Sequence, residues 1–138
     1  MRVRIRRFER RDLDDIMEIE KKAFPKTPYS RFTFMFYAFA LPRNFLVCED
    51  EERKRVVGYI IFHDDGHVVS VAVHPSMRRK GIGRALMNEV LKRTGGKAVV
   101  EVRESNETAI KFYKKLGFTF KTRIPNYYGD EDALIMSR

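Results

Sequence analysis

The chain has 138 residues, about the size of one ordinary domain, which excludes a long multidomain machine. It carries 28 Lys and Arg against 19 Asp and Glu, a net charge of +9, and its 43% hydrophobic content is too high for a disordered polyelectrolyte. The single cysteine, Cys48, excludes an internal disulfide framework, and no apolar run approaches the roughly 20 residues of a membrane helix, so we expect a soluble, cytoplasmic protein.

The first part of the chain predicts a strand followed by two helices. Apolar residues alternate with arginines over residues 3–8, the pattern of a strand, and then recur at helical spacing from Leu13 to Pro25. Ser30 is a good N-cap for a second helix running towards Pro42, although alternating phenylalanines in this stretch also fit a strand. The absence of Gly and Pro from residues 31–41 favours the helix.

The rest of the chain alternates strands and helices without repeats or linkers, as one α/β unit does. Three apolar, β-branched runs are separated by charged or turn-forming residues, which predicts three antiparallel strands. Two later helices end at glycines, where a left-handed residue is favoured. The expected strands cover residues 44–50, 55–63, 67–74, 97–102, 118–124 and 132–138, and the expected helices run from Ile82 to Gly95 and from Asn106 to Gly117. We expect a single domain over residues 1–138.

A basic, glycine-containing segment follows the strand at 67–74 and is the most informative stretch of the sequence. Its turn is rich in Arg and Lys, and Gly81 and Gly83 flank Ile82 where a helix starts. Backbone N–H groups in the first turn of a helix lack hydrogen-bond partners, and this end of the helix carries about half a positive charge. A phosphate accepts hydrogen bonds from these groups and balances the charge. The motif lacks the third glycine of the dinucleotide pattern and the Lys-Ser/Thr pair of the P-loop. We interpret residues 78–84 as an anion cradle, with a turn that only eases packing as the alternative.

Three motifs together resemble the GNAT superfamily of N-acetyltransferases over almost the whole chain. They are R-x-x-G-x-G after a V-x-V strand, E-V-R at the end of the next strand, and S-N-x-x-A-I-x-F-Y-x-x-L-G-F. The resemblance implies a mixed, mostly antiparallel α/β (α+β) fold with helices on both faces of the sheet and splayed central strands. It also implies acetyl-CoA as cosubstrate, with its pyrophosphate on residues 78–84 and its pantetheine arm between the splayed strands. By this resemblance, the cofactor-binding residues are Val71, Ala72, Val73, Arg78, Arg79, Lys80, Gly81, Ile82, Gly83, Arg84, Asn106 and Tyr113.

Acetyl transfer to an amine needs a base for the amine proton and an acid for the departing thiolate. Glu101 stands among valines in a strand expected to be buried, where a carboxylate is costly unless it is paired or functional. The resemblance favours Glu101 as the base, and an ion pair with Arg103 or Arg4 is the alternative. Tyr113, which spacing alone places in the core, is the acid by resemblance. His67 is a second candidate for the base, or else a histidine of a surface turn. His63 and His67 are four residues apart, but a turn separates them and no further ligand completes a zinc site, so we expect no metal.

Two further motifs look like the substrate loops of N-terminal protein acetyltransferases of the ribosomal-protein alanine type, F-P-x-x-P-Y-S at 24–30 and N-Y-Y-G-D-E-D-A-L-I-M at 126–136. The second loop is one residue shorter than the family's frequent Y-Y-x-D-G-E-D-A pattern, which puts the substrate preference in doubt. An α-amine, with a reference pKa of about 8, is neutral at pH 7 far more often than a lysine at about 10.4, so a modest base suffices. The residues that would grip the peptide are Phe24, Pro25, Tyr29, Tyr127 and Tyr128. For the last two, a loop packed before the final strand is the alternative.

Three other functions compete with this one. They are a small-molecule amine acetyltransferase, a CoA-binding regulator that does not use Glu101 and Tyr113, and a nucleic-acid-binding module. The last is prompted by the net charge of +9 and by the arginines near the start of the chain, which we expect to face outward from an edge strand. No nucleic-acid-binding motif accompanies them, so the basic face predicts at most weak electrostatic association with the ribosome or RNA.

Overall fold

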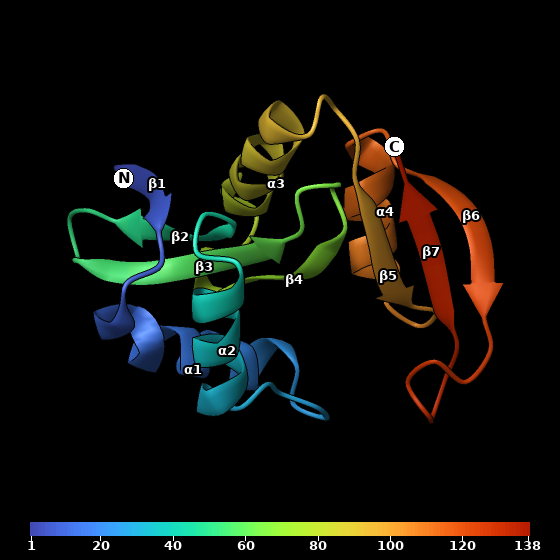
Figure 1. Cartoon of the computed structure of the whole chain (residues 1–138), viewed down its shortest axis with the longest axis horizontal. Helices are drawn as coiled ribbons and strands as arrows, with labels where there is room; N and C mark the ends of the chain where they lie inside the picture. The colour runs from blue at the N-terminus through green and yellow to red at the C-terminus, as the bar shows by residue number, and fades with distance from the viewer.

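The computed structural model describes residues 1–138, whose strands form two separate antiparallel sheets (Figure 1). The first sheet has the order β1-β2-β3-β4 and the second the order β5-β7-β6. The strands are β1 (Val3–Arg7), β2 (Phe45–Asp50), β3 (Arg55–Phe62), β4 (Val68–Val73), β5 (Val99–Arg103), β6 (Thr119–Ile124) and β7 (Ala133–Ser137). The helices are α1 (Leu13–Ala23), α2 (Arg31–Ala40), α3 (Ile82–Arg93) and α4 (Glu107–Lys115), with short 3-10 turns η1 (Arg10–Asp12) and η2 (Pro75–Met77). The predicted order of elements and the mixed, mostly antiparallel architecture are confirmed.

Helix α2 forms where the sequence also allowed a strand. The Ser30 side chain accepts a hydrogen bond from the Thr33 N–H at 3.2 Å, which satisfies one of the free donors of the first turn. Phe34 is buried against the rings of Phe45 and Tyr59. The other phenylalanines of α2 lie on the opposite side of the helix, so the alternating pattern arises from helix geometry and the strand interpretation is wrong here.

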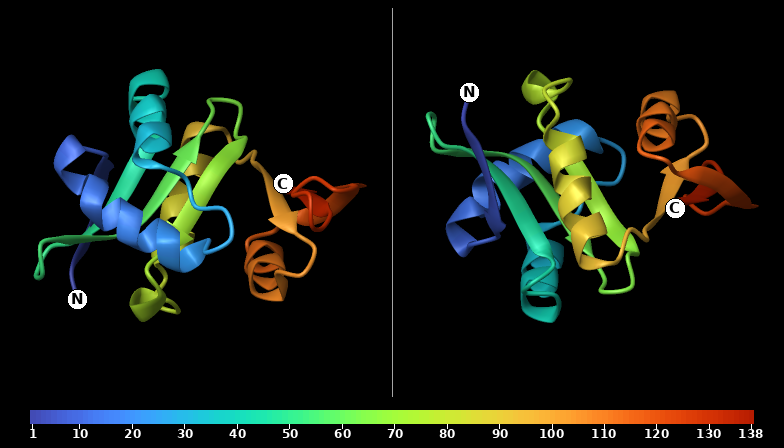
Figure 2. Two further views of the ribbon diagram at one scale, coloured as in Figure 1. Left: turned by 90° about the horizontal axis from the view of Figure 1, so that it is seen from below. Right: turned by 90° about the horizontal axis from the view of Figure 1, so that it is seen from above.

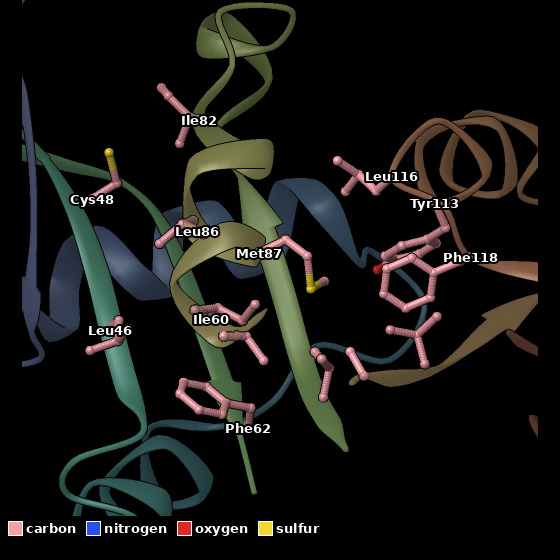
Figure 3. Packing of buried hydrophobic residues seen from close by; sticks show 14 of the residues in the cluster. Leu46, Cys48, Ile60, Phe62, Ile82, Leu86, Met87, Tyr113, Leu116 and Phe118 are labelled. Atoms are coloured by element: carbon pink, nitrogen blue, oxygen red, sulfur yellow. The ribbon is translucent and has the colours of Figure 1, made fainter. Parts of the chain in front are cut away.

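Helices cover both faces of the first sheet (Figure 2). Helices α1 and α2 lie on one face and α3 on the other, and none of the helices is both long and apolar enough to cross a membrane. The cluster on the α3 side continues into the second sheet. Figure 3 shows Leu86 of α3 next to Ile60 of the first sheet, and Met87 of α3 on the side of Tyr113 and Phe118 in the other half. Since each buried side chain of this size contributes about 1.5–3 kcal/mol to folding, this shared cluster holds the two sheets together.

Strands β4 and β5 lie side by side at one point only. A single parallel bridge joins His67, just before β4, to Val99 at the start of β5, and the Val99 N–H donates to the Gly66 carbonyl at 3.0 Å. Beyond this point the two strands diverge, and each sheet continues away from the other (Figure 1). The expected splay of the central strands is therefore confirmed, and it leaves one edge of β4 without a neighbouring strand.

The arginines near the start of the chain do not all face outward. Strand β1 is an edge strand, as expected, and Arg4 is exposed. Arg6, however, is largely buried and binds Asp12 at 2.8 Å and Glu49 at 3.0 Å. The expectation that every one of these arginines points to solvent is wrong, because Arg6 fastens β1 to β2 and to the start of α1. The basic stripe available to a nucleic acid is correspondingly smaller.

Candidate active site

A cavity of about 530 Å³ opens where β4 and β5 diverge. Its walls come from β4, β5, the segment between α1 and α2, the start of α4 and the loop before β7. The predicted site residues that line it are Phe24, Pro25, Tyr29, Val71, Glu101, Asn106, Tyr113 and Tyr128. Residues separated by about one hundred positions in the sequence thus line the same cavity. Tyr127 lies outside it, 47% exposed, and the side chain of Ala72 packs into the apolar cluster beneath α1 and α2.

The predicted anion cradle lies at the N-terminus of α3 rather than in the cavity wall. Arg79 and Gly81 both have positive φ, +63° and +82°, so the turn bends sharply just before the helix. Gly81 is the N-cap, no side chain caps the first turn, and the turn contains no acidic residue. The four cations here form no ion pair within the chain; they are Arg78, Arg79, Lys80 and Arg84. Free N–H groups and uncommitted positive charge are what a diphosphate requires.

Gly83 serves the packing of two helices. A Cβ at this position would meet the ring of Phe112 on α4 at 3.2 Å and Val73 at 3.7 Å. By contrast, a Cβ at Gly81 would meet no atom within 4 Å. The glycine at 83 therefore allows the start of α3 to approach α4 closely, so the packing alternative holds for Gly83 and not for Gly81.

The free edge of β4 turns backbone groups towards the splay. The His74 N–H donates to the Val57 carbonyl at 2.8 Å, and Val73 pairs with Gly58 in the antiparallel register. Because hydrogen-bonded and non-hydrogen-bonded pairs alternate along such a ladder, Val71 and Val73 fall at non-hydrogen-bonded positions. Their N–H and C=O groups consequently point away from β3, into the gap beside β5.

Glu101 is paired with a histidine, not with an arginine. The His67 Nε2 atom lies 2.6 Å and 2.9 Å from the two carboxylate oxygens of Glu101. The Glu101 side chain is 19% exposed and that of His67 is 39% exposed, so the pair spans the cavity wall and the outer surface. The alternative ion pairs are wrong, because Arg103 binds other carboxylates and Arg4 forms no ion pair. His67 does close a surface turn, as the alternative interpretation had it, and its ring also binds Glu101.

Tyr113 belongs both to the core and to the cavity. The period of α4 places it on the inward face, where it packs against Phe112 and Phe118. Its hydroxyl has no hydrogen-bond partner in the protein, yet no buried side-chain oxygen or nitrogen is left unpaired, so the hydroxyl oxygen borders the cavity. Burial raises the pKa of Tyr113 well above its usual value, and the nearby Tyr128 and Glu101 raise it further. The phenol therefore keeps its proton and can donate it.

Sequence analysis missed the part played by Glu20. This residue ends the apolar stripe of α1, is 1% exposed and lines the cavity. Its carboxylate accepts hydrogen bonds from the Tyr29 N–H at 2.8 Å and from the Tyr59 hydroxyl at 2.5 Å. Burial raises the pKa of Glu20, and the two hydrogen bonds counteract part of that rise. A glutamate at an inward helical position was the available signal, and its function is to hold the segment that carries Tyr29.

Arg103 holds the opposite loop, a second feature that sequence analysis missed. Its Nη1 donates to Asp130 at 2.8 Å and to Glu131 at 3.0 Å, and its guanidinium lies over the ring of Tyr128 at 4.2 Å. Arg103 lowers the pKa of Asp130 to about 2, whereas burial raises the pKa of Tyr128 to about 12. Tyr128 is thus a neutral hydrogen-bond donor at a fixed place on the cavity wall.

Comparison with known proteins agrees with this geometry. Residues 13–118 match the Acetyltransferase (GNAT) family. A protein of Methanocaldococcus jannaschii described as an uncharacterized N-acetyltransferase is 40% identical, and the match covers 96% of this chain and 88% of that protein. An N-alpha-acetyltransferase of Sulfurisphaera tokodaii is 35% identical, over 97% of this chain and 91% of its own length. The crystal structure of the ribosomal-protein-S18-alanine N-acetyltransferase from Escherichia coli has a TM-score of 0.81 at 31% identity, covering 99% of this chain and 92% of that one.

Proposed function

Because the chain belongs to the GNAT family of acetyltransferases, we propose that it acetylates the α-amino group at the N-terminus of a protein or peptide. Acetyl-CoA is the acetyl donor of this family, and acetyl transfer is the reaction class of the chain. The observation that carries the proposal is the meeting of Glu101 and Tyr113 at one cavity, whose remaining walls come from two tyrosine-bearing segments.

The residues along the splay fit acetyl-CoA. Residues 78–84 offer uncommitted cations and free N–H groups to its diphosphate. Val71 and Val73 offer backbone hydrogen-bonding groups to its extended arm, and the cavity continues from there to Tyr113. When bound, acetyl-CoA supplies an activated acetyl thioester.

Glu101 accepts the proton that the acceptor amine loses, directly or through one water. His67 holds both oxygens of this carboxylate, which fixes the direction in which the base points. Because the His67 side chain also reaches the outer surface, it gives the proton a path to solvent. His67 thus acts with Glu101 and does not replace it as the base.

Tyr113 supplies the proton at the other end of the reaction. As the new N–C bond forms and the C–S bond breaks, the departing sulfur takes the phenolic proton. The raised pKa of Tyr113 keeps it protonated until that step, and its unpaired hydroxyl is free to approach the sulfur. A backbone N–H on the free edge of β4, such as that of Val73, holds the thioester oxygen.

The acceptor enters between residues 24–30 and the loop at 126–132. Tyr29 and Tyr128 stand on opposite walls of the cavity and present rigid, flat surfaces with a hydroxyl, which suit a peptide backbone. The names of the relatives from Sulfurisphaera tokodaii and Escherichia coli, an N-alpha-acetyltransferase and an alanine N-acetyltransferase, support an α-amine as acceptor.

The test is acetylation of peptides that vary at their first two residues and all contain an internal lysine. The full chain is incubated with acetyl-CoA, and mass spectrometry locates the acetyl group. We expect modification of the α-amine and not of the lysine, since the α-amine is more often neutral at pH 7. Acetylation confined to lysines, polyamines or aminoglycosides would refute the proposed acceptor.

The proposed roles of Glu101 and Tyr113 are tested by kinetics. Tyr113→Phe should lower kcat about 100-fold, the contribution of a general acid, while acetyl-CoA affinity is largely kept. Glu101→Gln should lower kcat and change its dependence on pH. Tyr37→Phe is the matched control, because Tyr37 is a half-buried tyrosine of α2 outside the cavity wall. If Tyr113→Phe and Tyr37→Phe behave alike, Tyr113 is a core residue only.

A further inference from the structure

The outer face of α2 is a row of uncovered phenylalanines. Phe32, Phe36 and Phe39 share this face and are 81%, 54% and 86% exposed. Figure 2 shows α2 projecting from the body of the molecule. A buried aromatic side chain covers about 150–250 Å², so the three exposed rings offer on the order of 400 Å² of apolar surface. Patches of this size on soluble proteins are often interaction sites.

We propose that two copies of the chain pair through this face, with their α2 helices antiparallel about a two-fold axis. Such an interface must be self-complementary, because the same surface is used twice. The spacing of the rings meets this condition. Phe32 and Phe39 are two turns apart, about 10 Å along the helix, and Phe36 lies near the midpoint between them. A two-fold axis beside Phe36 therefore places each Phe32 next to the partner's Phe39.

The charges at the ends of α2 favour the antiparallel arrangement. Arg31 stands at the N-terminal, positive end of the helix; there is no acidic residue in the first turn and no basic residue in the last. Arg31 is more than half exposed and pairs with Asp14 of α1. In an antiparallel pair each Arg31 lies near the partner's C-terminal carbonyl groups, which attract a cation.

The overall charge of the chain makes α2 the suitable surface for self-association. A net charge of +9 opposes contact between two copies over most of the surface. Residues 32–42 contain no charged side chain, so this face is free of that repulsion. A standard interface buries about 800 Å² per partner, and the three rings supply about half of it. The neighbouring Met35, Ala40 and Pro42 extend the same uncharged surface.

The proposal is tested by analytical ultracentrifugation of the full chain up to about 100 µM, above the micromolar dissociation constants of weak interfaces. We expect a monomer–dimer equilibrium, which Phe39→Glu weakens at least tenfold because it buries a charge against an apolar ring. Phe120→Glu is the matched control, since Phe120 is 55% exposed on β6 and should leave dimerisation unchanged. A monomeric wild type, or equal effects of the two substitutions, would overturn the proposal.

Disulfide trapping tests the geometry separately. The native Cys48 is fully buried, and burial raises its pKa to about 11, so it does not interfere. Phe36→Cys should cross-link to itself upon oxidation, whereas Phe32→Cys should cross-link only when mixed with Phe39→Cys. Self-cross-linking of Phe32→Cys would overturn the antiparallel arrangement. Acetyl transfer is measured independently, so failure of the dimer and failure of the proposed reaction are distinguishable.

Discussion

Gly66 is the residue on which the junction between the two sheets depends, and Gly66→Ala is the most informative substitution outside the cavity. Its φ is +95°, and an added Cβ would lie 2.3 Å from the Lys97 carbonyl oxygen, far inside any real contact. The left-handed backbone alone costs an alanine about 1–2 kcal/mol. Relief of the clash requires the turn to move away from Lys97, which breaks the hydrogen bond from the Val99 N–H and costs about 1 kcal/mol more.

The expected loss for Gly66→Ala is therefore about 2–3 kcal/mol, a large part of the 5–15 kcal/mol typical of a domain. Urea unfolding at 25 °C measures it, with Gly96→Ala as the control. Gly96 has a similar φ of +88° but no atom within 4 Å of an added Cβ, so its substitution should cost only the strain of about 1–2 kcal/mol. Equal losses in the two variants would show that the contact with Lys97 is harmless and refute the reasoning.

The same substitution has a consequence for catalysis, because the residue after Gly66 is His67. A displaced turn moves His67 away from the carboxylate of Glu101. We therefore expect Gly66→Ala to lower kcat even at temperatures where the variant is fully folded, and Gly96→Ala to leave kcat unchanged. A fully active, folded Gly66→Ala variant would show that the pairing of His67 with Glu101 is not needed for the reaction.

Three further predictions concern the cavity wall and the anion cradle at residues 78–84. Burial raises the pKa of Glu20 above its unfolded value of about 4.3, so the wild type loses stability as pH rises through the folded pKa. Glu20→Gln should not show this loss. The unfolding free energy of Glu20→Gln minus that of the wild type should therefore be larger at pH 7 than at pH 4. A constant difference across that range would contradict the assignment. Arg103→Met removes the clamp on Asp130, Glu131 and Tyr128, so the peptide KM should rise about tenfold while the Kd of acetyl-CoA is unchanged in calorimetry. Lys80→Glu should reduce the rise in melting temperature that acetyl-CoA causes, and an unchanged rise would remove residues 78–84 from the binding site.

Local patterns in the sequence predicted the elements and much of the site. The helical period of α4 placed Tyr113 on the inward face of that helix. The valines around Glu101 predicted a buried strand, in which a carboxylate is costly unless it is paired or functional. Both residues reach the same cavity. The signal was local in each case, because the period of a helix or a strand determines which way a side chain faces. Ser30 likewise marked the start of α2.

The pairings between distant segments could not be read in this way. The alternative to a base at Glu101 was an ion pair with Arg103 or Arg4, but the bridge between His67 and Val99 brings Glu101 to His67, 34 residues earlier. Arg103 instead binds Asp130 and Glu131 in the loop just before β7, the strand that pairs with β5. Packing was one of the two roles expected for Gly83, but its partner, Phe112, could not be predicted because it depends on how closely α4 approaches α3. Such contacts depend on the docking of whole elements, which no single pattern encodes.

The open edge of β4 has a cost as well as a use. A strand with unpaired N–H and C=O groups is a ready template for aggregation, and soluble proteins normally shield it with charges, prolines or bulges. Along Val69 to Val73 this chain has no charge and no proline, only small and β-branched side chains, and its one irregularity is at Val69, where the register with β3 shifts. The diverging strand β5 protects this edge, because the gap between β4 and β5 is narrow. An extended ligand arm can enter the gap, whereas a strand that belongs to the sheet of another molecule cannot.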